Sequence, residues 1–174
     1  MQDAEYARLF LALWPDAALR ANLADYARSC NWQGRPARVS ADKLHLTLHF
    51  LGKVARASIP QLSTRLALPS PSFELVLGRP ALLGRNIAVI EALGIPAELR
   101  LLHESLQKTL LDFGLPVESR PFRPHLTLAR RAEQVGFPAE PLKTVWRVEE
   151  YLLLESRMET GEYRVLQRYP LTGA

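Results

Sequence analysis

The chain of 174 residues contains one cysteine, Cys30, so it cannot form a disulfide within itself. Nothing in the sequence therefore requires an oxidising compartment, and we expect a cytoplasmic protein. No apolar run approaches the roughly 20 residues needed to cross a bilayer, so we expect no membrane association. The first residues carry Asp3 and Glu5 where a signal peptide needs positive charge, and their apolar run stops at Pro15. We expect a first strand there, not a signal peptide.

Several motifs of common enzyme classes are also missing from the sequence. It has no P-loop, no Gly-rich dinucleotide turn and no carboxylate cluster suited to a metal, so we predict neither a cofactor nor a metal site. It also has no interdomain linker or low-complexity segment. With 48% hydrophobic and 23% charged residues, the composition predicts one globular domain over residues 1–174, and we expect a monomer. The net charge of +4 gives a mild preference for anionic partners.

The spacing of apolar residues predicts alternating strands and helices. Alternation with a period of two indicates a strand, whereas spacings of three and four indicate one face of a helix. Asp16 is a suitable N-cap for the first helix, and Pro60 and Pro96 lie where helices begin. The predicted elements are a strand 8–14, a helix 17–30, a strand 43–51, a short helix near 60, strands from 73 and 86, a helix from 96 to about 112, a strand from 125, and two long strands at the end with a turn around 160–161.

One tetrapeptide, His-Leu-Thr-Leu, occurs twice. It begins at His45 and again at His125, 80 positions later, in a chain with only four histidines. The same offset relates the strand, helix, loop and strand of the first half to those of the second half. We therefore predict an α+β fold in which two pseudo-symmetric lobes, each with an antiparallel sheet and helices, face each other across a catalytic cleft.

The repeated strand suits phosphodiester chemistry. On a strand, His45 and Thr47 share one face, as do His125 and Thr127, while the leucines lie behind them. A single His-x-Thr is more often structural, but polar residues on a strand face are costly to bury, and a duplicated fold explains repeated leucines better than repeated histidines. One neutral imidazole can accept a proton and the other, protonated, can donate one. The threonine hydroxyls can donate hydrogen bonds to phosphate oxygens.

The flanks of the two motifs give weaker signals. Strand alternation puts His49 on the face of His45, where it would line the cleft or lie in solvent. At i,i+4 on a strand the two histidines are about 13 Å apart, which argues against a zinc site. Alternation puts Phe50 and Arg130 on the leucine face, away from the catalytic pair. His103 is expected to be exposed on its helix.

Other flanking side chains are candidates for RNA contacts, each with an ordinary structural alternative. Charge near His125 could bind an RNA backbone or form a solvated rim. Aromatic residues could stack on bases or belong to the core. The arginines are Arg120, Arg123, Arg130 and Arg131; the aromatic residues are Phe10, Trp32, Phe50 and Phe122.

At "RLFLALWPD", "HLTLHFLG", "RPFRPHLTLAR" and "LLLESRMETGEYRVL", in that order, the sequence resembles the 2H phosphoesterase superfamily, and within it the RNA 2′,3′-cyclic phosphodiesterases, or 2′-5′ RNA ligase-like proteins. The resemblance implies metal- and ATP-independent hydrolysis of RNA 2′,3′-cyclic phosphate ends to 2′-phosphates, with weak reversible 2′-5′ ligation. It makes His45 and His125 catalytic, with His125 activating water and His45 protonating the leaving oxygen, although the sequence alone fixes neither role.

By the same resemblance, Thr47, Thr127 and Arg130 would bind the substrate phosphate, while Phe50, Arg123 and His49 are candidates for RNA contacts. The partner would be RNA with a 2′,3′-cyclic phosphate end, and tRNA fragments are one candidate source. Two alternatives remain open: a non-catalytic module that binds RNA ends, and a 2H phosphoesterase acting on a small nucleotide such as ADP-ribose cyclic phosphate.

Overall fold

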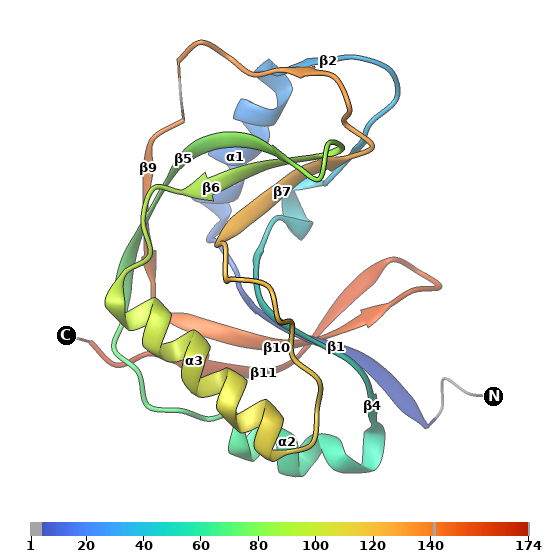
Figure 1. The fold of residues 1–174 in the computed structure, drawn as a ribbon, viewed down its shortest axis with the longest axis vertical. Coiled ribbons are helices and arrows are strands. Elements are labelled where there is room, and N and C mark those ends of the chain that lie inside the picture. Colours follow the sequence, from blue (N-terminus) through green and yellow to red (C-terminus); the bar gives the residue numbers. More distant parts are fainter. Residues whose placement is uncertain (1–4, 141, 174) are drawn as a thin grey trace.

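The computed structural model describes residues 5–140 and 142–173, and its α+β fold confirms the predicted class (Figure 1). Its helices and strands fall close to the predicted ranges, and Asp16 caps the first helix by accepting a hydrogen bond from the Leu19 amide. In chain order they are β1 (Tyr6–Leu13), α1 (Ala17–Ser29), β2 (Asn31–Trp32), β3 (Ala37–Arg38), the 3₁₀ turn η2 (Ala41–Lys43), β4 (Leu46–Ala55), the 3₁₀ turn η3 (Arg56–Ser58), α2 (Ile59–Arg65), β5 (Phe73–Leu83), β6 (Ile87–Ala92), α3 (Ala97–Asp112), β7 (His125–Arg130), β8 (Val135–Gly136), β9 (Thr144–Val148), β10 (Glu150–Arg157) and β11 (Glu162–Pro170).

The main sheet is antiparallel and strongly curled, with the order β11-β10-β1-β4-β7-β6-β5-β9, and β3 adds to β7. One lobe is the half from β11 to β4, and the other is the half from β7 to β9. The two halves form one continuous sheet, since β4 and β7 pair at its centre, where Leu46 lies opposite Leu126. The repeat offset of 80 relates these two leucines, so the pseudo-twofold axis passes between them.

The predicted duplication is confirmed, with one addition concerning the helices. The unit β1-α1-β4 corresponds to β6-α3-β7. However, α1 packs against β7 of the other half, and α3 packs against β4 (Figure 1). The two helices thus cross over between the lobes, and both bury their apolar faces in one shared core.

That core lies on the helix side of the sheet. Leu9, Leu11 and Leu13 of β1 enter it, and so do both leucines of each repeated tetrapeptide. Phe10 and Ala12 point to the opposite side of the sheet, where they join Leu152 and Leu154 of β10 in a smaller cluster. We call this opposite side the open face. Truncating a core leucine such as Leu46 to alanine would cost about 2–5 kcal/mol of stability.

Two predicted boundaries were wrong. The strand expected from Lys43 begins at Leu46, because Ala41–Lys43 form a 3₁₀ turn. The tail contains three strands, not two: β9 pairs with β5 of one lobe, and the chain then crosses at Glu149 to pair with β1 of the other as β10. The apolar pattern is continuous through this change of partner, so the sequence does not reveal it. Within residues 5–140 and 142–173, no helix is both long and apolar enough to span a bilayer.

Candidate active site

The two repeated histidines have the same backbone setting. The Nδ1 atom of His45 lies 2.7 Å from the Lys43 carbonyl oxygen, and that of His125 lies 2.6 Å from the Arg123 carbonyl oxygen. A carbonyl can only accept, so Nδ1 carries the hydrogen in both rings. Each neutral ring therefore has its lone pair on Nε2, which is the atom available for proton transfer.

Both His-Thr pairs lie on the open face. Leu46 and Leu126 are neighbours across the sheet centre and both enter the core, so the residues that flank them on each strand point the other way. Thr47 lies opposite Ala12, a member of the open-face cluster, and Thr127 lies opposite Val89. The structure thus places all four residues on one face of the sheet, on the two neighbouring strands β4 and β7 or directly before them.

A β-bulge in each repeated strand changes the face of the residues that follow. In β4, Leu11 lies opposite His49 and Ala12 opposite Thr47, which leaves Leu48 as an extra residue. In β7 the extra residue is Leu128, its equivalent at the offset of 80. The pattern of buried and half-buried residues over 44–50 is repeated over 124–130. Such a bulge shifts strand alternation by one residue.

Because of the bulges, three predictions made from strict strand alternation were wrong. Phe50 is 54% exposed and contacts Phe10, so it lies on the open face and not with the leucines. Arg130 has the equivalent position on β7 and is also exposed. His49, expected on the open face, is 6% exposed and lies on the core side, and its equivalent Ala129 is fully buried.

The electrostatics of His45 indicate that the two motifs are close in space. Burial is the main cause that lowers the pKa of His45, and the positive charges of Arg130 and His125 lower it further. The hydrogen bond to the Lys43 carbonyl opposes this shift. His125 and Arg130 of β7 therefore act on His45, which immediately precedes β4.

His45 is buried because three aromatic side chains pack around its ring. The Trp14 ring stacks on the imidazole at 5.1 Å between centroids and an interplanar angle of 4°. Phe10 and Tyr163 lie at 5.3 Å and 5.4 Å. The sequence makes Phe10 a base-stacking or core candidate, but it gives no such role to Trp14 or Tyr163. Trp14 continues the alternation of Phe10 and Ala12, a signal that could have placed it on this face, whereas Tyr163 comes from β11 far along the chain.

His49 and His103 form a separate pair beneath α3. His49 Nε2 lies 2.9 Å from the His103 carbonyl oxygen, and the two rings stack with centroids 4.0 Å apart. Phe122 stacks on the other side of His103 at 3.9 Å. The prediction that His103 is exposed was therefore wrong, because the segment before β7 covers it. Burial lowers the pKa of His103 to about 4, the charge of His49 adds to this, and a hydrogen bond to the backbone of Leu48 opposes it.

The remaining flanking residues have structural partners or lie at the edge. Arg123 forms an ion pair with Glu91, a buried carboxylate that lies opposite His125 on β6. Arg120 pairs with Glu118. The Trp32 indole donates a hydrogen bond to the Ala27 carbonyl at 2.7 Å and packs against the core.

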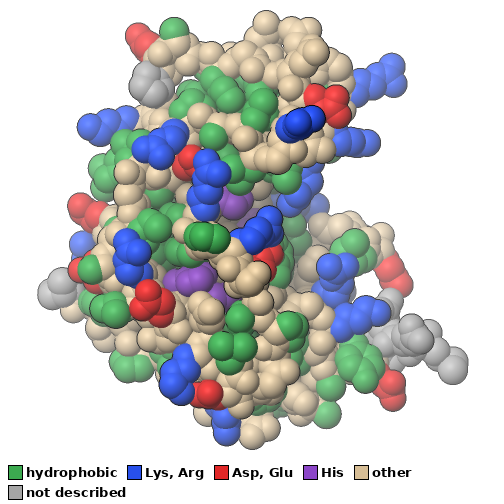
Figure 2. Space-filling view, in the orientation of Figure 1, with side chains coloured by type: hydrophobic (Ala, Val, Ile, Leu, Met, Phe, Trp, Pro, Cys, Tyr) green, Lys and Arg blue, Asp and Glu red, His purple; other side chains and the backbone are tan. Residues whose placement is uncertain are grey.

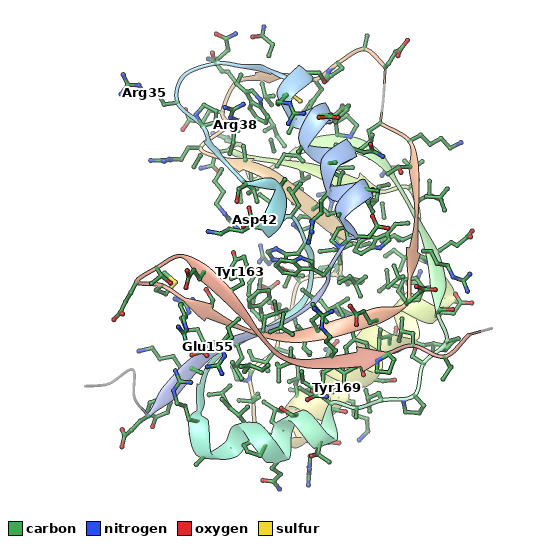
Figure 3. The ribbon with its side chains drawn as sticks, turned by 180° about the vertical axis from the view of Figure 1, so that it is seen from behind. Arg35, Arg38, Asp42, Glu155, Tyr163 and Tyr169 are labelled. Carbon is green, nitrogen blue, oxygen red and sulfur yellow. The ribbon has the colours of Figure 1, made fainter. Side chains whose placement is uncertain are left out.

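A groove opens beside His45, between η2 and the hairpin formed by β10 and β11. Its volume is about 540 Å³, and we call it the hairpin groove. Trp14 and Tyr163 line it as well as contacting His45. Figure 3 shows Asp42 and Tyr163 on its two sides. On the face drawn in Figure 2, histidine side chains are recessed, and Lys and Arg side chains lie beside the upper ones.

No group of three or more His, Cys, Asp or Glu side chains suited to a metal ion occurs in the described part of the chain. Two imidazoles, two hydroxyls and a guanidinium nevertheless form a suitable set for a phosphate, since they supply proton transfer and hydrogen-bond donors together.

Comparison with known proteins agrees with this chemistry. A family model described as the 2′-5′ RNA ligase superfamily matches residues 15–159. A protein of Escherichia coli (strain K12) named RNA 2′,3′-cyclic phosphodiesterase is 33% identical over 173 residues, covering 95% of this chain and 97% of its own length. A protein of the same name from Geobacillus stearothermophilus is 31% identical over 78% of this chain, which spans only about half of that protein (48%).

Solved structures extend the likeness to three dimensions. The crystal structure of E. coli LigT in apo form superposes with a TM-score of 0.85 at 29% identity, covering 97% of this chain and 99% of that one. A second crystal structure, of E. coli LigT complexed with 3′-AMP, gives a TM-score of 0.84 over the same shares.

Proposed function

Because the chain belongs to the 2′-5′ RNA ligase superfamily, we propose that it hydrolyses RNA 2′,3′-cyclic phosphate ends to 2′-phosphates by two-histidine general acid-base catalysis. The observation that carries the proposal is the matched setting of His45 and His125, each holding its Nδ1 against a backbone carbonyl. This setting fixes the tautomer and leaves both Nε2 atoms for proton transfer.

The reaction transfers two protons. One neutral imidazole takes a proton from water as the water oxygen bonds to phosphorus. The other imidazole, protonated, gives its Nε2 proton to the 3′ oxygen as the bond from that oxygen to phosphorus breaks. The product keeps its phosphate on the 2′ oxygen. No metal is needed for these steps, because the two histidines supply both the base and the acid.

The non-bridging phosphate oxygens gain negative charge during this reaction. Thr47 and Thr127 would donate hydrogen bonds to them, and Arg130 would add a charged donor. The bulges support this role for Arg130, since they return it to the open face. Phe50 shares that face and is free to stack on a base.

The surroundings of the two histidines differ, as different roles require. His45 lies among Phe10, Trp14 and Tyr163, whereas His125 lies opposite the buried carboxylate Glu91, which is paired with Arg123. This difference in surroundings supports unlike roles for the two rings, one as the base and the other as the acid.

The same groups would also join RNA. If the 5′-hydroxyl of a second RNA replaces water, its oxygen bonds to phosphorus while the 3′ oxygen leaves, and a 2′-5′ linkage results. The proton transfers are unchanged, so weak reversible ligation is part of the proposal.

The test uses a short RNA ending in a 2′,3′-cyclic phosphate, incubated with the protein with and without EDTA. We expect a product with a 2′-phosphate, identified by phosphorus NMR, at an equal rate in both. Binding without turnover at any pH would favour an RNA-end-binding module instead. Turnover of ADP-ribose cyclic phosphate in strong preference to RNA would favour a small-nucleotide enzyme, and loss of activity in EDTA would refute metal independence.

A further inference from the structure

From the hairpin groove we infer a binding site for the nucleotide that precedes the cyclic end of an RNA, so that the protein prefers RNA ends over mononucleotides. This inference rests on the proposed function. It begins with a property of the substrate: an RNA that ends in a 2′,3′-cyclic phosphate continues only from its 5′ side. Any preference for RNA therefore requires a surface next to the reacting phosphate.

The hairpin groove is next to that position. Trp14 and Tyr163 each have a ring against His45 and also line the groove. Lys43 lines it too, and its carbonyl oxygen is the acceptor for His45 Nδ1. An RNA strand that leaves the reacting phosphate past His45 therefore reaches the groove within one nucleotide. The groove volume of about 540 Å³ is enough for a base and a ribose.

The chemistry of the lining suits a nucleotide. Tyr163 and Trp14 present aromatic rings, on which any base can stack. Lys43 from η2 and two arginines of the hairpin, Arg157 and Arg164, provide cationic groups for a phosphodiester. Across residues 5–140 and 142–173, none of these three cations forms an ion pair, so their charge is available to a ligand.

Two carboxylates also line the groove. A hydrogen bond from the Ser40 side chain lowers the pKa of Asp42, and the charges of Lys43 and Arg20 lower it further, so Asp42 is ionised and can accept a base N–H. Glu162 accepts a hydrogen bond from Thr160 within the turn. The three cations outnumber the two anions, which favours an anionic occupant.

The two walls of the groove come close together beside Gly161. The Lys43 ammonium from η2 comes so near the β10–β11 turn that a Cβ built on Gly161 would lie 3.7 Å from it. A single side chain thus spans the two walls.

The experiment compares a trinucleotide ending in a 2′,3′-cyclic phosphate with the mononucleotide 2′,3′-cyclic AMP. In the double variant R157Q/R164Q we expect kcat/KM for the trinucleotide to fall about tenfold or more, since charge-assisted contacts to phosphate are lost. The rate on the mononucleotide should stay unchanged. A matched variant, E162Q, removes a repelling charge from the same groove and should raise kcat/KM for the trinucleotide only.

The outcomes separate the inference from the proposed function. Equal losses on both substrates, or no loss on either, would overturn the groove assignment while leaving the cyclic phosphodiesterase intact. If the wild-type protein hydrolyses neither substrate, the proposed function fails, and binding of a trinucleotide 3′-phosphate then tests the groove by itself. Weaker binding in R157Q/R164Q than in wild type would support the site, and equal binding would overturn it.

Discussion

The imidazole of His103 lies between the rings of His49 and Phe122, and it hydrogen-bonds the backbone of Leu48, the extra residue of the β4 bulge. Helix α3 is thereby joined to the repeated strand β4 on one side and to the segment leading into β7 on the other. The contact gives a hydrogen-bond partner to the backbone of a bulged residue, which lies outside the regular ladder of the sheet.

Stability should fall in acid partly because of His103. Its pKa is about 4 in the folded protein and about 6.5 when unfolded, so the unfolded state binds more protons between these values. The contribution is complete above pH 6.5 and is lost as pH falls through 4. His49 and His45, whose pKa values are also lowered by burial, act in the same direction. Urea unfolding at pH 7 and pH 4.5 measures the effect.

The variant H103F isolates the contribution of that residue, since it keeps a ring between His49 and Phe122 but cannot titrate. We expect a smaller loss of stability between pH 7 and pH 4.5 than in wild type, with some loss remaining from the other histidines. An unchanged pH dependence would contradict the assignment.

Removal of either repeated imidazole should abolish most of the activity. We expect H45A and H125A each to lower kcat on cyclic-phosphate RNA by on the order of 10²- to 10⁴-fold, a typical contribution of general acid-base catalysis. Circular dichroism should show that both variants remain folded, because both side chains lie on the open face and not in the core. Turnover within a few-fold of wild type in either variant would refute the mechanism.

The pKa of His45 should respond to Arg130. NMR titration of wild type should give a midpoint for His45 below 6.5, because burial and the nearby positive charges disfavour the imidazolium. In R130Q one of those charges is gone, so the midpoint should rise. R131Q changes the next residue, which is exposed and is not among the causes of the shift. An equal midpoint in wild type and R130Q would mean that the two strands are farther apart than described.

Phe50 should contribute to substrate binding and little to stability. Stacking of a base on an aromatic ring is worth about 1–3 kcal/mol, so F50A should raise KM for cyclic-phosphate RNA roughly 5- to 150-fold. Because the side chain is 54% exposed, the unfolding midpoint should change little. L111A truncates a similarly exposed residue on α3 and should leave KM unchanged. Equal KM values for F50A and L111A would exclude the base-stacking role.

The repeat was the most informative part of the sequence. His45, Thr47, His125 and Thr127 could be placed on one face from period-two alternation and the common offset, and the core leucines followed from the same pattern. The bulges could not be predicted, since Leu48-His49 and Leu128-Ala129 do not differ from ordinary strand residues in composition. Without the bulges, strand alternation places His49, Phe50 and Arg130 on the wrong faces. In each case the error is a shift of one residue.

Long-range contacts limited the prediction elsewhere. Tyr163 reaches His45 only because β10 pairs with β1 and β11 continues the sheet. His103 is covered because the segment that contains Phe122 returns over α3. Neither contact leaves a local pattern in the sequence, so neither could be predicted without knowledge of the fold.

The exchange of α1 and α3 between the lobes has a consequence for the ancestry of the chain. A gene for a single unit of strand, helix and strand would encode a protein whose helix has no sheet of its own to cover, since α1 packs on β7 and α3 on β4. In a pair of such units, each helix would cover the sheet of the other unit. One histidine from each unit would lie at their common axis. The chain thus has the symmetry of a two-fold dimer joined into one polypeptide, with one repeated histidine beside the central pairing of Leu46 and Leu126 on each strand.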